Sequence, residues 1–289
     1  MIVLDLLGGL GNQLFVWAAG RALEMNGQEV SYCTCRLEAD KGRRYLLGDL
    51  GLLLRFTDKH PSRHFNAGIG YCPEIFSLTG DWTLMGYFQS EKYWSDEVRS
   101  SIVDSLWPVV FFEPSDSTYA MAIRISRPYP KCCFVHVRRS DNLSPRGLSF
   151  HGLTSDSRSF YYDRAMAKMP ADTHFFVFSD DPAWCKTVFI NSNQTVVDCN
   201  APSFTVDGKF ELTKNDQGTE VQDLWLMSLC KHAIIANSSF SWWGAWLGER
   251  MYLKEQDDRI VIAPDPWFAD PKADSSDIVP ARWLKVKIK

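Results

Sequence analysis

Hydrophobic residues occur along the chain in short runs typical of buried strands and in longer stretches with helical spacing. At the start, apolar runs at residues 2–6 and 29–33 flank residues 12–26, where apolar positions recur with the period of a helix. Gly27 follows that stretch, at the place where a glycine commonly ends a helix. The pattern therefore predicts a β-α-β unit at the start of the chain.

The same alternation returns in the second half of the chain. It predicts strands at 132–137, 174–178, 196–198 and 233–236, and helices at 160–168, after Pro182, at 220–231 and at 240–251. Between the two halves, residues 40–80 are rich in Gly, Pro, Arg and His, which favours loops and short helices. A further helix is expected at 91–106.

Two prolines, Pro128 and Pro130, interrupt the alternation. We therefore expect two domains, residues 1–128 and residues 129–289, with a C-terminal segment that can cross back to the first. Strands that alternate with helices pair in parallel. The predicted fold class is α/β, with two parallel sheets and a ligand cleft between them.

The composition is that of a globular protein without a nucleic-acid footprint. Of the 289 residues, 45% are apolar and 23% charged, and the net charge is −4. The first residues lack a basic stretch and a long apolar run, so we expect no signal peptide or membrane anchor and a cytoplasmic location.

Cysteines and histidines do not show the spacing of a metal site. The eight cysteines form no CxxC pair, and Cys33 and Cys35 lie closer together than the cysteines of common zinc sites. Outside the HVRRSD motif, the histidines are likewise scattered, at positions 60, 64, 151, 174 and 232. We therefore expect reduced structural thiols and no bound metal.

Two adjacent arginines follow the predicted strand at 132–137, in the sequence HVRRSD at 136–141. Ligands bind at the carboxyl ends of strands in open α/β sheets. The guanidinium groups of Arg138 and Arg139 match phosphate oxygens in shape and stay charged. The motif predicts a diphosphate clamp, a local positive site in a mildly acidic protein, with a solvated loop of charges as the alternative.

A glycine-rich turn, GGLGNQ at 8–13, lies between the first strand and the first helix. Backbone N–H groups in such a turn can receive a phosphate. Gly9 and Gly11 fit the first half of the dinucleotide fingerprint, but Leu14 stands where its third glycine belongs. A ligand loop and a purely structural turn both remain open.

Two further motifs combine polar residues with predicted strand ends. In FSDD at 178–181, Asp180 can cap the next helix, while Asp181 can accept two hydrogen bonds from guanine. In the sequence ANSSFSWWG at 236–244, Ser238 and Ser239 precede a helix, where hydroxyl and N–H groups can hold a phosphate without metal. A serine cap followed by packed tryptophans is the alternative.

Taken together and in this order, the motifs are far more specific than any one of them. With GYFQSEKYW at 86–94 and LMSLCKHAIIANSSFSWWGAWL at 226–247, the chain resembles the α-1,2-fucosyltransferases of glycosyltransferase family 11 nearly from end to end. The resemblance implies a GT-B architecture of two Rossmann-like domains, the first on the acceptor side and the second binding the nucleotide sugar. It also implies GDP-fucose as donor, inversion at the anomeric carbon and no metal.

The resemblance also assigns roles to residues of this sequence. Arg138 would lie against the β-phosphate with Arg139 beside it, Asn12 near the leaving oxygen, and Asp181 at guanine. The catalytic residues expected are Asn12, Glu91, Arg138 and Asp141. The donor-binding residues expected are Gly9, Gly11, Asn12, Gln13, His136, Arg138, Arg139, Asp181, Ser238, Ser239 and Phe240.

Several alternatives remain at this point. Ser140 and Asn142 replace the glycine and aromatic residue usual in the family, which leaves the donor sugar and the acceptor open. We expect transfer to a glycan hydroxyl, the 2-hydroxyl of a galactoside, with Glu91, Asp141 and His151 as candidate bases. The alternatives are another GDP-6-deoxysugar such as GDP-rhamnose, or a non-catalytic glycan-binding protein.

Overall fold

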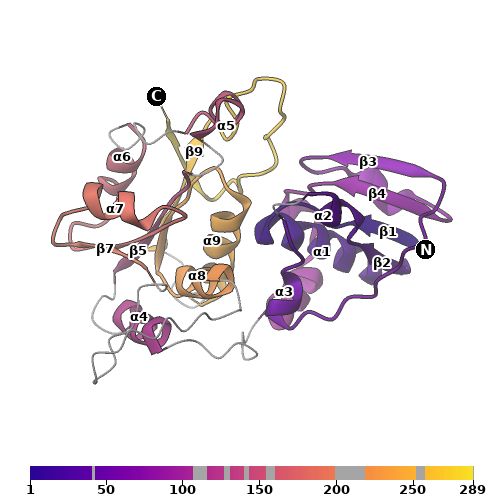
Figure 1. Ribbon diagram of the computed structural model, residues 1–289, viewed down its shortest axis with the longest axis horizontal. Coiled ribbons are helices and arrows are strands. Elements are labelled where there is room, and N and C mark those ends of the chain that lie inside the picture. The colour runs from indigo at the N-terminus through magenta and orange to yellow at the C-terminus, as the bar shows by residue number, and fades with distance from the viewer. Residues whose placement is uncertain are drawn as a thin grey trace. The chain divides into compact units, whose positions relative to one another are not determined.

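The computed structural model consists of two compact units, each with a parallel sheet of its own (Figure 1). It describes residues 1–40, 43–106, 116–126, 131–139, 143–153, 160–198, 219–251 and 258–288. The first unit comprises Met1–Phe112 and Pro271–Pro280, and the second Glu113–Asp270 and Ala281–Lys289.

The division between the units comes earlier than the prolines at 128 and 130 predict. Helix α4 (Asp116–Ser126) lies in the second unit, where the Thr118 hydroxyl donates a hydrogen bond to the Gln222 side chain. Both residues are buried. This contact, rather than the proline pattern, determines the unit to which α4 belongs.

The first unit contains a four-stranded parallel sheet in the order β2-β1-β4-β3. Its strands are β1 (Ile2–Asp5), β2 (Val30–Cys33), β3 (His64–Gly68) and β4 (Trp82–Gly86). Its helical elements are α1 (Leu10–Met25), α2 (Cys35–Ala39), η1 (Leu47–Leu50), η2 (Pro73–Ser77), η3 (Glu91–Tyr93) and α3 (Asp96–Leu106). Helix α1 packs against β1, β2 and α3, and twelve of its residues are buried.

The predicted β-α-β start is confirmed, but the prediction of loops for residues 40–80 is wrong for one segment. Strand β3 lies within that range at the edge of the sheet. Only Ala67 of its five residues is buried, so the strand has no apolar run to show in the sequence. Edge strands with polar side chains leave this weak a pattern because only one neighbour and one face are covered.

The second unit contains a six-stranded parallel sheet in the order β10-β9-β8-β5-β6-β7. Its strands are β5 (Cys132–Val137), β6 (His174–Ser179), β7 (Gln194–Val196), β8 (His232–Ile234), β9 (Val261–Asp265) and β10 (Leu284–Lys287). Besides α4, its helices are α5 (Pro145–His151), α6 (Tyr162–Met166), α7 (Pro182–Val188), α8 (Thr219–Ser228) and α9 (Ser239–Met251). Two parallel α/β sheets are confirmed, but the sequence did not predict β4 of the first sheet or β9 and β10 of the second.

Helices α8 and α9 pack closely because α9 carries a small residue at the contact. A Cβ atom on Gly244 would come within 2.9 Å of the Cβ of Met227. Trp242 and Trp243 are fully buried, and Trp246 is nearly so. The interpretation of these tryptophans as packing residues is therefore confirmed.

Each sheet has one place where the direction of strand succession reverses. In the first sheet, β2 lies on one side of β1 and β4 on the other. In the second, β6 lies on one side of β5 and β8 on the other. Loops that leave the carboxyl ends of two such strands diverge and open a crevice, where ligands of α/β sheets bind. The two loop pairs at these reversal points therefore determine where a ligand can be held.

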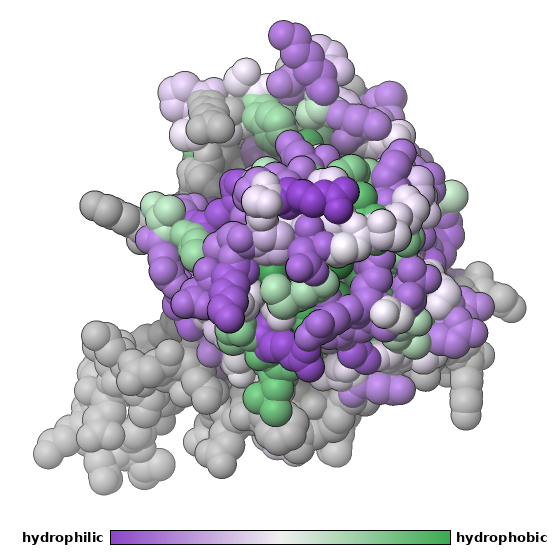
Figure 2. All heavy atoms as spheres, turned by 90° about the vertical axis from the view of Figure 1, so that its right-hand side faces the viewer, coloured by the Kyte–Doolittle hydropathy of each residue, from purple (hydrophilic) through white to green (hydrophobic). Residues whose placement is uncertain are grey.

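The surface shown in Figure 2 is mainly hydrophilic, with hydrophobic side chains confined to small separate areas. Small apolar areas of this kind are ordinary on a folded protein. Among the described residues, no helix is long and apolar enough to cross a membrane.

Candidate active site

The two arginines lie at the carboxyl end of β5, as predicted, and each contacts an aspartate that follows β6. Nη1 of Arg138 is 3.0 Å from Oδ2 of Asp180, and Nε of Arg139 donates to Oδ2 of Asp181 over 3.0 Å. The backbone N–H of Arg139 also donates to Oδ1 of Asp180 over 2.8 Å. The parallel pairing of β5 with β6 brings the two motifs, HVRR and FSDD, to the same edge of the sheet.

Arg139 is held from two directions. Besides its bond to Asp181, its guanidinium carbon lies 3.8 Å from the ring centroid of Trp184, which is the geometry of a cation–π contact. Asp181 caps α7 by accepting from the backbone N–H of Trp184 over 3.0 Å. The capping interpretation therefore holds, but for Asp181 and not for Asp180.

Among the described residues, two carboxylates offset the two arginines, which differs from the local positive site that the sequence suggests. Asp180 and Asp181, at the end of the neighbouring strand, lie opposite Arg138 and Arg139. The side chain of Arg138 is 27% exposed and that of Arg139 is 13% exposed. Arg138 is thus the arginine better placed to meet a ligand, with Asp180 fixing the direction of its guanidinium.

The serine turn lies beside the arginines, on the other side of β5. It follows β8, which pairs with β5, and it leads into α9. Ser238, Ser239 and Phe240 are partly exposed, while Ser241 is buried. The first N–H groups of a helix lack partners within the helix, so this turn offers N–H and hydroxyl donors beside Arg138.

His136, two residues before Arg138, contacts the serine turn through Phe240. Its ring centroid lies 5.8 Å from that of Phe240, and its backbone carbonyl accepts from the Tyr162 hydroxyl over 3.0 Å. Burial, reinforced by the nearby positive charge of Arg138, lowers the pKa of His136 from its usual 6.5 to about 3. The imidazole is therefore neutral at physiological pH and serves as a packing group behind the arginines.

Asn237, directly before the serine turn, connects it to two other segments by side-chain hydrogen bonds. Its side-chain amide nitrogen donates to the carbonyl oxygens of His151, over 2.9 Å, and of Trp267, over 3.0 Å. Asn237 is 3% exposed, so these bonds form in a nearly water-free setting where each stabilises the chosen geometry. The turn before α9 is thereby tied to the ends of α5 and β9.

In the first unit, the glycine turn presents Asn12 toward the loop after β4. Oδ1 of Asn12 accepts from Nε2 of Gln89 over 2.9 Å. Gly8 has φ +70, and a Cβ there would lie 2.5 Å from Nδ2 of Asn12. Phe88 is fully buried with φ 52, a conformation that costs a non-glycine residue on the order of 1–3 kcal/mol. A constrained backbone on both sides therefore aligns the Asn12 and Gln89 amides.

Other residues of the glycine turn shape it from within. Gly9 caps α1 with its carbonyl, which accepts from the backbone N–H groups of Asn12 and Gln13, and Gly11 is buried in the first turn. Gln13 is fully buried, and its amide bonds to backbone atoms of Gly8, Arg44 and Leu46. The predicted contact of Gln13 with the nucleotide sugar is not supported, because its amide nitrogen and its amide oxygen are both bonded to the backbone.

The three candidate bases differ in how far the structure describes them. Glu91 begins η3, and its side chain, 13% exposed, is paired with Arg99 over 3.2 Å. His151 ends α5 with its ring 6.0 Å from that of Phe268. Asp141 lies outside the described residues, as do Ser140 and Asn142, whose departure from the family pattern the sequence identified.

Comparison with known proteins identifies the family of this chain. The model of the family named glycosyl transferase family 11 matches residues 72–287. The chain belongs to glycosyltransferase family 11. It is therefore a glycosyltransferase, and as such it acts on a nucleotide sugar and a glycan acceptor.

Relatives within family 11 cover the chain to different extents. An α-1,2-colitosyltransferase of Escherichia coli is 29% identical over 99% of both chains. The O-antigen biosynthesis glycosyltransferase WbnK of Escherichia coli is 34% identical over 47% of this chain and 38% of its own. A galactoside 2-α-L-fucosyltransferase of Bos taurus, SEC1, is 31% identical over 41% of this chain and 30% of its own.

Among solved structures, a mutant of FUT1 from Arabidopsis thaliana in complex with GDP covers 86% of this chain and 68% of that one. The sequence identity is 14% and the TM-score 0.40. A similarity at this level does not place side chains, so the site described here stands on its own contacts.

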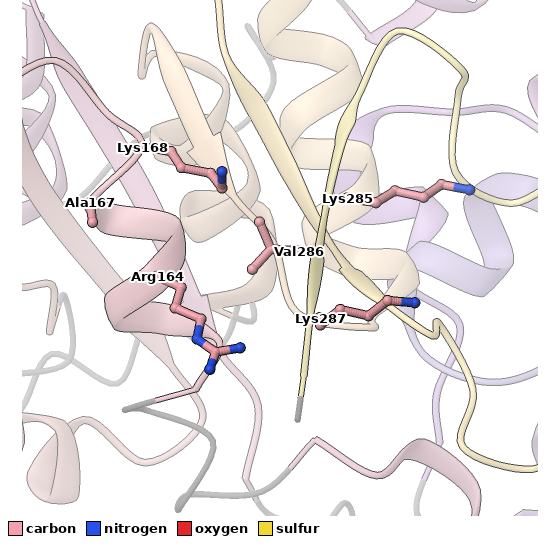
Figure 3. Close-up of a pocket in the computed structure, with 6 residues that line it drawn as sticks. All are labelled: Arg164, Ala167, Lys168, Lys285, Val286 and Lys287. Carbon is pink, nitrogen blue, oxygen red and sulfur yellow. The ribbon is translucent and has the colours of Figure 1, made fainter.

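The pocket drawn in Figure 3 is distinct from these motifs. It lies between α6 and β10, and none of the predicted site residues lines it. Val286 points toward α6, while Lys285 and Lys287 point to the other side of the strand (Figure 3). Side chains alternate between the two faces of a strand, and here the covered face carries Val286 while the exposed face carries the two lysines. Because β10 is an edge strand, the lysines place charge at this edge of the sheet.

Sequence reasoning missed three residues that hold predicted site residues in place. Asp180 pairs with Arg138, Trp184 stacks on Arg139, and Gln89 bonds to Asn12. For Asp180 the signal was available, because two acidic residues after one strand complement two basic residues after its neighbour. Trp184 and Gln89 carry no such signal, since their partners are distant in sequence.

Proposed function

We propose that this family 11 enzyme transfers L-fucose from GDP-fucose to a galactoside 2-hydroxyl, with inversion and without a metal. The observation that carries the proposal is the strand edge where Arg138 and the Ser238–Ser239 turn flank β5. A fixed cation and a helix N-terminus on adjacent loops suit a diphosphate. The activities for which the E. coli and Bos taurus relatives are named support an α-1,2 linkage.

The proposed reaction is a single displacement at the anomeric carbon. The acceptor oxygen bonds to that carbon as the bond from the carbon to the β-phosphate oxygen breaks and GDP departs. The hydroxyl proton passes to a base, and negative charge builds on the diphosphate. Groups aimed at that growing charge stabilise the transition state more than the ground state, which accelerates the reaction.

Arg138 is proposed to carry most of this stabilisation. Asp180 holds its guanidinium in place, so little reorganisation is needed when the leaving group becomes charged. The hydroxyl groups of Ser238 and Ser239 add donors from the neighbouring loop. These groups can do the work for which other transferases use a divalent cation, which is the basis for proposing metal independence.

Asn12 and a base complete the proposed chemistry. The amide of Asn12, aligned by Gln89, is proposed to contact the leaving oxygen. For the base, Asp141 is favoured over Glu91, because Glu91 is largely covered and paired with Arg99. A comparison of Asp141→Asn with Glu91→Gln decides between them, and the true base should cost 10²–10⁴-fold in turnover.

Colitose is a second candidate sugar, favoured by the near-complete coverage of the E. coli colitosyltransferase. Colitose lacks the 3-hydroxyl of fucose and is otherwise the same 6-deoxysugar. A site built to bond that hydroxyl rejects the deoxy sugar about 10⁴-fold, whereas an apolar site rejects an added hydroxyl only about 10²-fold. The size of the preference therefore tells which sugar the site is built for.

The test measures GDP release from GDP-fucose, GDP-colitose and GDP-rhamnose, each with a terminal galactoside and with its 2-deoxy analogue. The proposal expects turnover with GDP-fucose, none with the 2-deoxy acceptor, and an α-1,2 product by NMR, all unchanged by EDTA. Turnover with only GDP-colitose, or with only GDP-rhamnose, would show that this nucleotide sugar and not GDP-fucose is the donor. Glycan binding without any GDP affinity would overturn the enzymatic proposal.

A further inference from the structure

Three side chains that bind soft metals converge in the first unit, although their spacing in the sequence is not that of a common metal site. Cys33 ends β2, Cys35 begins α2, and His60 lies in the loop before β3. Nε2 of His60 is 3.2 Å from Sγ of Cys33 and 3.5 Å from Sγ of Cys35, and the two sulfur atoms are 2.6 Å apart. All three ligand atoms lie within 4.8 Å of one another.

Asp5 at the end of β1 stands on the far side of the imidazole. Its Oδ1 is 4.0 Å from Nδ1 of His60, while its Oδ2 accepts from Nε of Arg36 over 2.9 Å. Asp5 is 6% exposed, and its Oδ1 has no hydrogen-bond partner among the described residues. A carboxylate facing the second nitrogen of a histidine is the usual support of a metal-bound imidazole.

We propose that Cys33, Cys35 and His60 bind a thiophilic metal ion of the Zn²⁺ type, with Asp5 orienting His60. Two thiolates and one imidazole form the ligand set that Zn²⁺ prefers, and three protein ligands leave a fourth position for water or a small ligand. Binding releases the thiol protons to solvent. Zn–S bonds of about 2.3 Å require the sulfur atoms to move apart, which the exposed Cys35 allows.

The site would join three segments near the glycine turn. The backbone N–H of Leu6 donates to the carbonyl of Cys33 over 2.9 Å, and the chain continues from Leu6 into Gly8 and Gly9. A metal here links β2 and α2 to the loop that carries His60, and Asp5 connects that link to β1. The metal would hold these segments together, and no step of the proposed sugar transfer passes through it.

The test uses the full chain, reduced and freed of metal, then incubated with Zn²⁺ and passed through a desalting column. About one equivalent of zinc per chain should remain by mass spectrometry of metals, and Zn²⁺ should raise Tm. Co²⁺ should give the absorption of a tetrahedral thiolate site. Cys33→Ser, Cys35→Ser and His60→Ala should lose retention, and Asp5→Asn should weaken binding 10–100-fold.

Matched controls exist in the same unit. Cys72→Ser and His64→Ala change residues of the same types at other positions, and both should keep the zinc. If the reduced wild-type chain retains no zinc, or if the ligand variants retain as much as the controls, the proposal is wrong. A Cys33–Cys35 disulfide in the isolated protein with no zinc uptake after reduction would also overturn it. Because the readout is metal content, failure here leaves the transferase proposal unaffected.

Discussion

The two strand reversals of this protein are built from different chemistry. At the first, between β1 and β4, neutral amides meet, with Gln89 donating to Asn12. At the second, between β5 and β8, Arg138 is paired with Asp180 beside a helix N-terminus. Fixed neutral dipoles suit the alignment of a reacting oxygen, whereas charged groups suit an anion. We therefore expect the second unit to bind the nucleotide and the first unit to align the reacting oxygen.

Loss of the exposed arginine should have the largest effect. In Arg138→Ala, kcat with the donor should fall on the order of 10²–10³-fold, as when other preorganised donors are removed. Steady-state GDP release measures the change. Arg164→Ala is the control, because Arg164 on α6 lines the pocket beside β10, which includes none of the predicted site residues. Full turnover in Arg138→Ala would remove Arg138 from the mechanism.

Removal of both hydroxyls of the serine turn should have the next largest effect. A hydrogen bond to a charged group contributes about 1.5–3 kcal/mol, so the loss of one such bond in Ser238→Ala with Ser239→Ala should weaken GDP binding by roughly 10–100-fold. Calorimetry with GDP checks this, with Ser149→Ala on exposed α5 as the control. Unchanged affinity in the double variant would leave the turn as a simple helix cap.

A smaller effect is expected at the neutral reversal. Gln89→Ala should lower kcat by about 10-fold while GDP affinity stays the same, because Gln89 acts by positioning Asn12. Gln28→Ala, whose amide bonds to the carbonyls of Phe76 and Leu78, should change neither. Residues that act through one contact are not additive, so Asn12→Ala with Gln89→Ala should cost little more than Asn12→Ala alone. Additive losses would show that Gln89 works separately.

The smallest effect concerns stability and pH. Burial lowers the pKa of His136 from 6.5 to about 3, so the unfolded chain binds a proton below pH 6.5 that the folded chain does not. Stability from this group is present above pH 6.5 and is lost as pH falls, by about 2 kcal/mol at pH 5. Urea unfolding of wild type and His136→Gln should show their difference shrinking between pH 7.5 and 5.

The comparison between these two variants isolates His136 from other groups. Burial raises the pKa of Asp223 to about 7, which favours the folded state at low pH and acts in the opposite direction. Both proteins contain Asp223, so its contribution cancels in the difference. A difference that does not change with pH would mean that His136 titrates normally in the folded protein.

The sequence predicted several of the strands that bury apolar runs, but it did not predict β4 or β9, most of whose residues are also buried. Strand β5 was predicted with its observed bounds because all six of its residues are buried. Strand β3 was missed because it is an exposed edge strand, and the assignment of α4 was missed because it depends on a contact with Gln222, far along the chain. Local pattern shows burial, but it does not show pairing between distant segments.

The candidate site shows the same limit. Motifs placed Arg138 at a strand end and Asn12 and Ser238 where a strand leads into a helix, and the structure finds them there. Arg138 is paired with Asp180, and Asn12 is bonded to Gln89. Each partner follows a neighbouring strand, so the pairs can be identified only when the order of the strands in the sheet is known. The sequence therefore predicted where these groups lie relative to the strands, while the pairing of the two arginines with aspartates required the structure.

The most direct test of the contrast between the two reversals is calorimetry of GDP binding to three proteins: wild type, Arg138→Ala and Asn12→Ala. The account predicts that Arg138→Ala binds GDP much more weakly than wild type, while Asn12→Ala binds with wild-type affinity despite its loss of turnover. Wild-type affinity in Arg138→Ala together with lost affinity in Asn12→Ala would contradict it, because the nucleotide would then depend on the neutral reversal.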